Sequence, residues 1–109
     1  MVVFHVRNSE IIKCNIDDLI LWDLKENVTT GYRWLLSDNE EVESLKSNYI
    51  KFISEDFFSD NPQLIGSGGT VRFEFKAIKR GKTEIEIFYR RPWEKTLNDK
   101  SEILSIIIT

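Results

Sequence analysis

Three short segments of this 109-residue sequence carry the residue types best suited to recognising another molecule. Residues 27–32 read NVTTGY, residues 66–69 read GSGG, and residues 91–93 read RPW. Threonine hydroxyls offer hydrogen bonds from small side chains, glycines let a backbone approach a partner chain, and an exposed tryptophan often dominates binding energy. The candidate binding residues are therefore Asn27, Val28, Thr29, Thr30, Gly31, Tyr32, Gly66, Ser67, Gly68, Gly69, Arg91, Pro92 and Trp93.

Catalysis has little support in the sequence. Cys14 is the only cysteine and His5 the only histidine, and both fall in expected strands away from the three segments, with no third group to orient them. We interpret both as structural and assign no catalytic residue. A single cysteine can form neither a disulfide within the chain nor a multi-cysteine metal site, and we expect no metal or other cofactor. The glycines of 66–69 lack the lysine and the following helix of a phosphate-binding loop.

The charge balance argues against nucleic acid as a partner. The formal net charge is -3 and the isoelectric point is about 5.2, whereas a nucleic-acid footprint needs clustered lysine and arginine. No stretch approaches the roughly 18 to 20 apolar residues that cross a bilayer, so we expect no membrane span. The opening MVVFHVRNSE lacks the features of a secretory signal, which predicts a cytoplasmic location. A lysosomal or secreted location is the alternative if a signal peptide preceded Met1.

Short strands are expected to hold the three segments in place. Residues 18–24 are apolar and aromatic enough for a buried strand, with Ile20, Trp22 and Leu24 on one side. Apolar and polar residues alternate in 71–77, as in a strand with one buried face. We expect Trp22 and Trp34 to point into the core. Further strands are expected at 2–7, 10–16, 32–37, 48–58, 85–89 and 102–109, and residues 38–47 have the caps and acidic first turn of one short helical turn.

Two pairings of neighbouring strands follow from the connections between them. Residues 71–77 and 85–89 flank the turn sequence KRGK, which predicts an antiparallel hairpin. Residues 2–7 and 10–16, split by Asn8 and Ser9, predict either a first hairpin or a bent edge strand. Seven or eight short strands with almost no helical periodicity predict an all-β, immunoglobulin-like sandwich. We expect one domain spanning residues 1–109 and a monomer.

Counting strands predicts where the three segments lie. Each strand carries the chain from one end of a sandwich to the other, so two strands bring it back to the same end. Two strands are expected between 27–32 and 66–69, and two more between 66–69 and 91–93. All three segments should therefore emerge as loops at one end, as the antigen-binding loops do on variable domains.

The motifs NVTTGYRW, LIGSGGT and YRRPW, in this order, resemble the three signature loops of the chagasin-type inhibitors of papain-like cysteine peptidases. The usual family motifs are NPTTGY, a G-x-G-G loop and RPW. The resemblance spans nearly the whole chain, from the strand before Asn27 to the last strand. It implies a chagasin-like, immunoglobulin-like domain that inhibits such peptidases by reversible, non-covalent, tight binding.

The resemblance also implies a role for each loop. Thr29, Thr30 and Gly31 would lie over the catalytic cysteine of the peptidase, with 66–69 along the non-primed side and 91–93 covering the primed side. Val28 stands where the family pattern has proline, so the loop loses a fixed φ, and we expect weaker or more selective inhibition. We expect a positive φ at Gly31 and an exposed Trp93.

Two questions stay open from the sequence. Arg91 is suited either to bonding the partner or to fixing its own loop. A non-inhibitory immunoglobulin-like module for adhesion or ligand binding is the alternative function, and it would explain the fold but not the three motifs.

Overall fold

The computed structural model describes residues 1–7, 10–27, 30–36, 48–61, 63, 68–91, 93 and 100–109. These residues form eight β-strands and no α-helix, which confirms the all-β prediction for the part of the chain described. No helix in these ranges is long and apolar enough to cross a membrane. The strands are β1 (Val3–Val6), β2 (Ile11–Cys14), β3 (Leu19–Glu26), β4 (Arg33–Leu35), β5 (Ile50–Ser59), β6 (Gly69–Ala77), β7 (Gly81–Arg90) and β8 (Lys100–Ile108).

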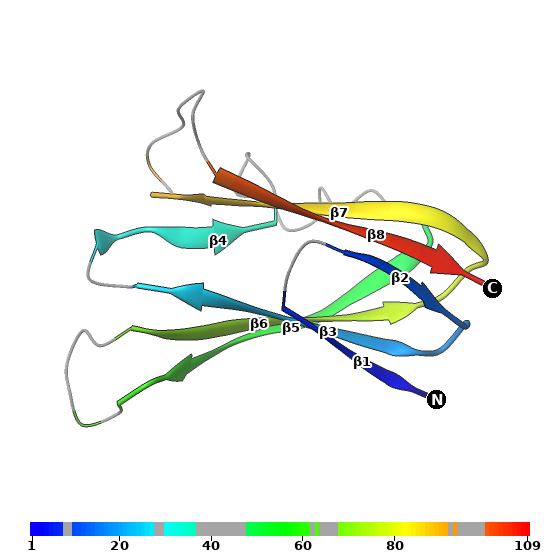
Figure 1. Cartoon of the computed structure of the whole chain (residues 1–109), viewed down its shortest axis with the longest axis horizontal. Helices are drawn as coiled ribbons and strands as arrows, with labels where there is room; N and C mark the ends of the chain where they lie inside the picture. The colour runs from blue at the N-terminus through cyan, green and yellow to red at the C-terminus, as the bar shows by residue number, and fades with distance from the viewer. Residues whose placement is uncertain are drawn as a thin grey trace.

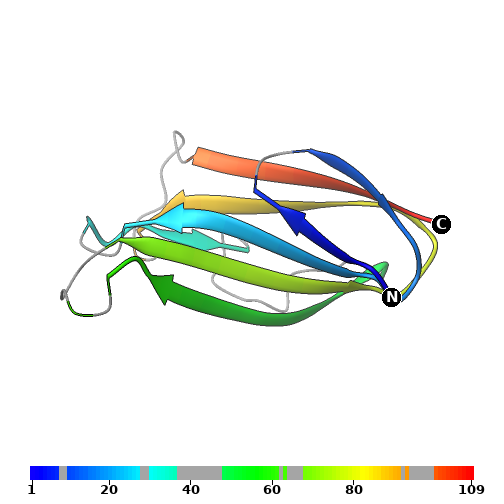
Figure 2. The same ribbon diagram turned by 60° about the horizontal axis from the view of Figure 1, so that its bottom comes forward.

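The strands form two four-stranded sheets that pack face to face (Figure 1). The order in the first sheet is β1-β3-β6-β5, and the order in the second sheet is β2-β8-β7-β4. Both views place the two chain termini at one end of the sandwich (Figure 2). Strands β3, β5 and β7 end at the opposite end, where β4, β6 and β8 begin.

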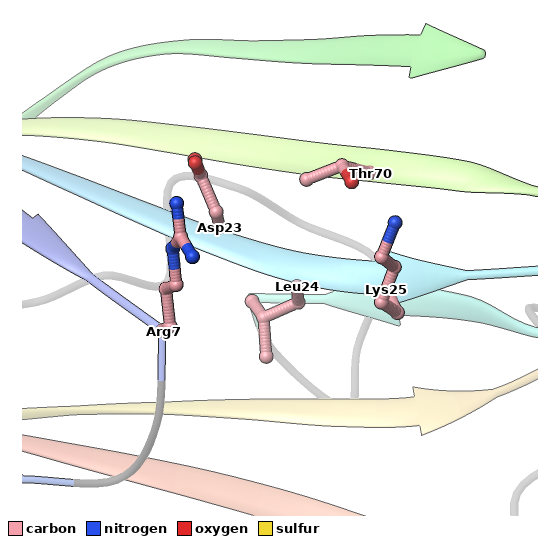
Figure 3. A pocket seen from close by; sticks show the side chains of 5 residues that line it. All are labelled: Arg7, Asp23, Leu24, Lys25 and Thr70. Atoms are coloured by element: carbon pink, nitrogen blue, oxygen red, sulfur yellow. The ribbon is translucent and has the colours of Figure 1, made fainter. Parts of the chain in front are cut away.

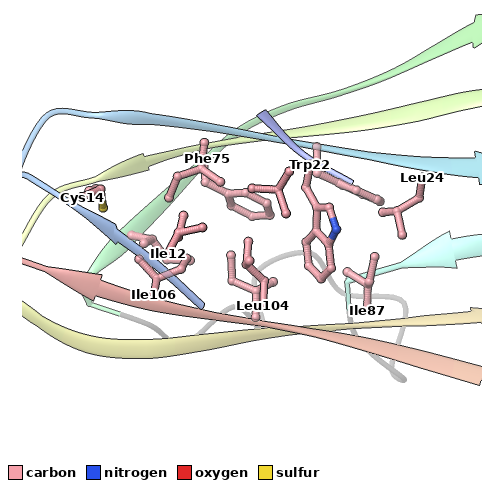
Figure 4. Close-up of a cluster of buried hydrophobic side chains, with 14 of the residues drawn as sticks. Ile12, Cys14, Trp22, Leu24, Phe75, Ile87, Leu104 and Ile106 are labelled. Carbon is pink, nitrogen blue, oxygen red and sulfur yellow. The ribbon is translucent and has the colours of Figure 1, made fainter. Parts of the chain in front are cut away.

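The core lies between the sheets and is built from the alternating apolar residues (Figure 4). In β3 the side chains of Ile20, Trp22 and Leu24 are buried, and β6 adds the buried rings of Phe73 and Phe75. The second sheet supplies buried residues from β7 and β8, namely Ile85, Ile87, Leu104, Ile106 and Ile108. Trp22 and Trp34 are both core residues, which confirms the expectation that they point inward.

The predicted hairpin between residues 71–77 and 85–89 is wrong. These residues lie in β6 and β7, which belong to different sheets: β6 pairs with β3 and β5, and β7 pairs with β8 and β4. Alternation shows which face of a strand is buried, and here both buried faces meet in the same core. It does not show which strand lies alongside. Gly81, with φ of 144°, starts β7 and leaves room for the ring of Tyr49.

The first two strands form a bent edge and not a hairpin. Strand β1 runs parallel to β3 in the first sheet, and β2 runs parallel to β8 in the second, so the chain changes sheets between them. The buried Asp18 carboxylate fixes this region, because it accepts hydrogen bonds from the backbone N–H groups of Val2 (2.9 Å) and Asn15 (2.8 Å). The helical turn predicted at 38–47 lies outside the described residues.

Candidate functional site

The described parts of the three predicted loops come together at the end opposite the termini. Gly31 follows β3, Gly68 precedes β6, and Trp93 follows β7. The predicted placement is confirmed for Asn27, Thr30, Gly31, Tyr32, Gly68, Gly69, Arg91 and Trp93. Val28, Thr29, Gly66, Ser67 and Pro92 lie outside the described residues.

Thr30 closes the turn of the first loop. Its Oγ1 donates a hydrogen bond to the carbonyl oxygen of Asn27 at 2.9 Å, and its backbone N–H donates to the same oxygen at 3.4 Å. The backbone N–H of Tyr32 donates to Thr30 Oγ1 at 3.4 Å. The next residue, Gly31, has φ of 79°, which confirms the positive φ expected there. The Thr30 hydroxyl therefore acts first as an internal brace of its own loop.

Trp93 is exposed and contacts the first loop. Its exposed fraction is 71%, in agreement with the expectation for a tryptophan outside any strand. A Cβ atom built on Gly31 would lie 3.2 Å from Trp93 Cη2 and 3.7 Å from Arg91 Cγ. One edge of the indole therefore packs on the turn at Gly31, and most of its surface is available to a partner.

Arg91 contacts its own chain at the first loop. Its Nε donates a hydrogen bond to the carbonyl oxygen of Thr30 at 3.1 Å. Its Cζ lies 5.0 Å from the centre of the Tyr32 ring, within the range of a cation–π interaction. Of the two roles open from the sequence, these contacts favour fixing the loops.

Tyr89 is a site residue that the sequence reasoning missed. Its ring stacks on Tyr32 with centroids 5.4 Å apart and lies 4.7 Å from the ring of Trp34. Its hydroxyl oxygen accepts a hydrogen bond from the backbone N–H of Asn27 at 3.4 Å. One feature of the sequence could have indicated it: Tyr89 stands two residues before Arg91. Side chains two residues apart in an extended chain point to the same side of the strand, so Tyr89 is expected to face the same way as Arg91.

The two described glycines of the second loop differ in what surrounds them. A Cβ on Gly69 would lie 2.5 Å from Phe57 Cζ and would also collide with the carbonyl oxygen of Phe58. A Cβ on Gly68 would meet only ordinary contacts, 3.5 Å from the carbonyl oxygen of Glu26 and 3.7 Å from Asp60 Oδ2. Gly69 is therefore required by the packing of β5 against β6, which the sequence did not indicate, whereas a side chain at Gly68 would meet no clash.

Glu26 is a buried carboxylate at the base of the first two loops. Its exposed fraction is 6%, and its backbone pairs with Gly69 in the first sheet. Burial holds the pKa of this carboxyl above its ordinary value, although the backbone N–H of Trp34, at 3.4 Å, and the charge of Arg33, at 3.7 Å, both lower it. The charged form of Glu26 thus lowers the stability of the folded protein, and the contacts with Trp34 and Arg33 partly offset this cost.

A separate pocket of about 290 Å³ lies beside the end of β1, where β3 continues past its parallel partner (Figure 3). Its Asp23 carboxylate is bound by two nitrogens of Arg72, at 2.7 and 2.9 Å. Within the described ranges, no group of three His, Cys, Asp or Glu side chains could hold a metal ion. None of the lining residues is a predicted binding residue: they are Arg7, Asp23, Leu24, Lys25 and Thr70.

Comparison with known proteins agrees with the geometry of the loops. The family model described as chagasin family peptidase inhibitor I42 matches residues 15–107. This chain belongs to the chagasin family of peptidase inhibitors. It is 29% identical to amoebiasin-1 of Entamoeba histolytica over 83 residues, which cover 76% of this chain and 74% of that protein.

Solved structures of two other proteins share the fold of this chain. A cysteine protease inhibitor from Entamoeba histolytica superposes with a TM-score of 0.82 at 23% identity, covering 100% of this chain and 97% of that one. The protein PbICP-C, solved in complex with falcipain-2, gives a TM-score of 0.72 at 20% identity, with 100% of both chains covered. These likenesses confirm the predicted immunoglobulin-like sandwich.

Membership of the chagasin family decides between the functions considered. The family consists of peptidase inhibitors, so the chain is an inhibitor and not an enzyme. The same finding favours inhibition over the alternative of an adhesion or ligand-binding module.

Proposed function

We propose that this chagasin-family chain inhibits papain-like cysteine peptidases by inserting the loop 27–32 into the active-site cleft. The loops containing 66–69 and 91–93 flank the cleft on either side. Binding is reversible and forms no covalent bond. The observation that carries the proposal is the joint surface of the first and third loops, where the exposed Trp93 packs on the turn at Gly31.

Two findings on related proteins support the choice of peptidase class. One structural relative is described as a cysteine protease inhibitor, and another was solved bound to falcipain-2. Both share the sandwich that places the loop ends on one side of this chain.

The shape of the first loop suits a wedge that is not cleaved. A peptide substrate lies extended in a protease cleft, whereas the chain here turns at Gly31 with φ of 79°. Thr30 and Gly31 are small enough to enter a narrow cleft. The peptide bonds around them are held by the Thr30–Asn27 hydrogen bonds of the turn, so they do not adopt the extended register of a substrate.

The position of Cys14 supports the non-covalent mode. It is buried in β2, and its carbonyl oxygen accepts the backbone N–H of Thr109, which places it at the terminal end of the sandwich, away from the loops. Burial, together with the nearby Asp18 carboxylate, raises the pKa of its thiol, so it stays protonated. A mixed disulfide with the peptidase's catalytic cysteine is therefore not available to the folded inhibitor.

The test is a titration of papain with the purified protein while substrate hydrolysis is followed. We expect hydrolysis to fall with increasing inhibitor, to recover on dilution, and the catalytic cysteine to be protected from a covalent thiol label. Trypsin serves as the control, because a serine peptidase should keep its activity. Full papain activity at micromolar inhibitor would refute the proposal.

A further inference from the structure

The first loop is braced from within by the Thr30 hydroxyl, which donates to the carbonyl oxygen of Asn27, but its sequence has no residue with a fixed φ. Residues 27–32 contain no proline, and Gly31 adds conformational freedom. A binding loop that samples many conformations loses apparent affinity, because only the competent fraction can bind. Contacts from elsewhere in the chain can therefore add to the order that Thr30 supplies.

We propose that Arg91 and Tyr89 are positioning residues that hold the loop 27–32 in its inserting conformation before any peptidase binds. The inference rests on the proposed function for what the loop inserts into. The contacts themselves exist in the free chain. Arg91 acts on the tip of the loop, and Tyr89 acts on its base.

Arg91 combines two contacts that only a planar guanidinium makes together. Nε donates to the carbonyl oxygen of Thr30 at 3.1 Å, while Cζ lies 5.0 Å from the centre of the Tyr32 ring. A lysine keeps the charge but has a single ammonium, which cannot stack flat on Tyr32 and direct a fixed N–H at Thr30. The two residues on either side of Gly31 are thus held by one side chain from the third loop.

Tyr89 links the base of the loop to the core. Its hydroxyl accepts a hydrogen bond from the Asn27 N–H, and its ring contacts those of both Tyr32 and Trp34. Trp34 is itself buried and donates from Nε1 to the carbonyl oxygen of Lys25 at 2.8 Å. A continuous series of contacts therefore runs from a core tryptophan through Tyr89 and Tyr32 to Arg91.

Amide hydrogen exchange in the free protein tests the proposal directly. In Arg91→Lys we expect faster exchange at the amides of Thr30 and Tyr32, and in Tyr89→Phe faster exchange at Asn27. Core amides in β3 and β6 should exchange as in the parent. Arg80→Lys is the matched control, because Arg80 is an exposed arginine between β6 and β7, and it should change none of these rates.

Inhibition of papain gives the second readout. If the competent fraction of the loop falls to about a tenth, Arg91→Lys weakens inhibition about tenfold, and Arg91→Met weakens it to the same degree. A charge contact with the peptidase would instead be kept by lysine and lost only in the methionine variant.

The results separate this inference from the proposed function. Unchanged exchange at Thr30 and Tyr32 in Arg91→Lys overturns the positioning role of Arg91, and unchanged exchange at Asn27 in Tyr89→Phe overturns that of Tyr89. Both results stand whether or not papain is inhibited. Failure of the parent protein to inhibit papain overturns only the proposed function.

Discussion

The indole of Trp93 occupies the space into which a side chain at Gly31 would project, with Cη2 3.2 Å from the position of a Cβ atom. Gly31 also has φ of 79°, where a residue with a side chain is strained by about 1 to 2 kcal/mol. We expect Gly31→Ala to weaken papain inhibition about tenfold, because this strain favours other loop conformations. The measurements are the inhibition constant and the thermal unfolding midpoint of the Gly31→Ala variant and of the parent. Unchanged inhibition would show that the turn is not required for binding.

Trp93 itself is expected to contribute to binding far more than to folding. It is exposed, so Trp93→Ala should leave the thermal midpoint nearly unchanged. An exposed tryptophan at the centre of an interface is often worth about 2 kcal/mol or more, so inhibition should weaken at least about tenfold. Trp34→Ala is the control with the opposite pattern, because Trp34 is a core residue whose loss lowers the midpoint strongly. A large drop in the midpoint of Trp93→Ala would contradict the assignment.

Gly68 and Gly69 allow the two uses of glycine to be separated. Gly69→Ala should destabilise the fold by about 1 to 3 kcal/mol, because its Cβ collides with Phe57 and Phe58. Gly68→Ala should leave the free energy of unfolding unchanged, since its Cβ has room, and should weaken inhibition if the peptidase backbone approaches there. Urea unfolding and inhibition constants for both variants check this. Equal stability of the two variants would contradict the packing argument.

The strand faces and the shared end of the loops were predictable, because both depend on local alternation and on the number of strands. The expected inward positions of Trp22 and Trp34 are both confirmed. Strand neighbours were not predictable in the same way, since β6 and β7 bury the same pattern from opposite sheets.

The side-chain contacts that hold the site together could not be predicted from the sequence either. Nothing in an alternating strand marks Tyr89 as the acceptor for the Asn27 N–H, because that contact joins residues 62 positions apart. The role of Gly69 depends in the same way on Phe57, which lies on the neighbouring strand. Such contacts depend on the register between distant strands, and the register is set by the whole fold.

Because Glu26 is buried, we expect its replacement by glutamine to stabilise the folded protein by an amount that depends on pH. Its pKa is raised in the folded protein, so the folded state is favoured when this carboxyl is protonated, and that stability is lost as pH rises through the folded pKa. Glu26→Gln keeps an acceptor for the Trp34 N–H without the charge. We expect it to be more stable than the parent at pH 7, with the difference vanishing below the ordinary glutamate value of 4.5. Urea unfolding across this range is the measurement.

Asp23 provides a control for the Glu26 experiment, because its pKa is shifted in the opposite direction. Its bidentate hydrogen bonds with Arg72 hold the pKa of the carboxyl below the ordinary value of 3.8. The stability from this pair is present above that value and is lost as pH falls through the folded pKa. Asp23→Asn should therefore be less stable than the parent at pH 7 and should approach it in strong acid. A Glu26→Gln variant that behaved like Asp23→Asn would show that Glu26 stabilises the fold when ionised.

Val28 stands where the chagasin pattern has proline, and replacing it tests whether loop order limits affinity. Val28→Pro should tighten papain inhibition about two- to fivefold, because a proline that fits the bound loop removes about 0.4 to 1 kcal/mol of freedom from the free chain. The gain should be larger in the Arg91→Lys background, where the guanidinium contacts with Thr30 and Tyr32 are missing and more freedom is left to remove. Inhibition constants for the parent, the two single variants and the double variant check this. Equal gains in both backgrounds would mean that proline and Arg91 act independently, and no gain in either would mean that loop order does not limit binding.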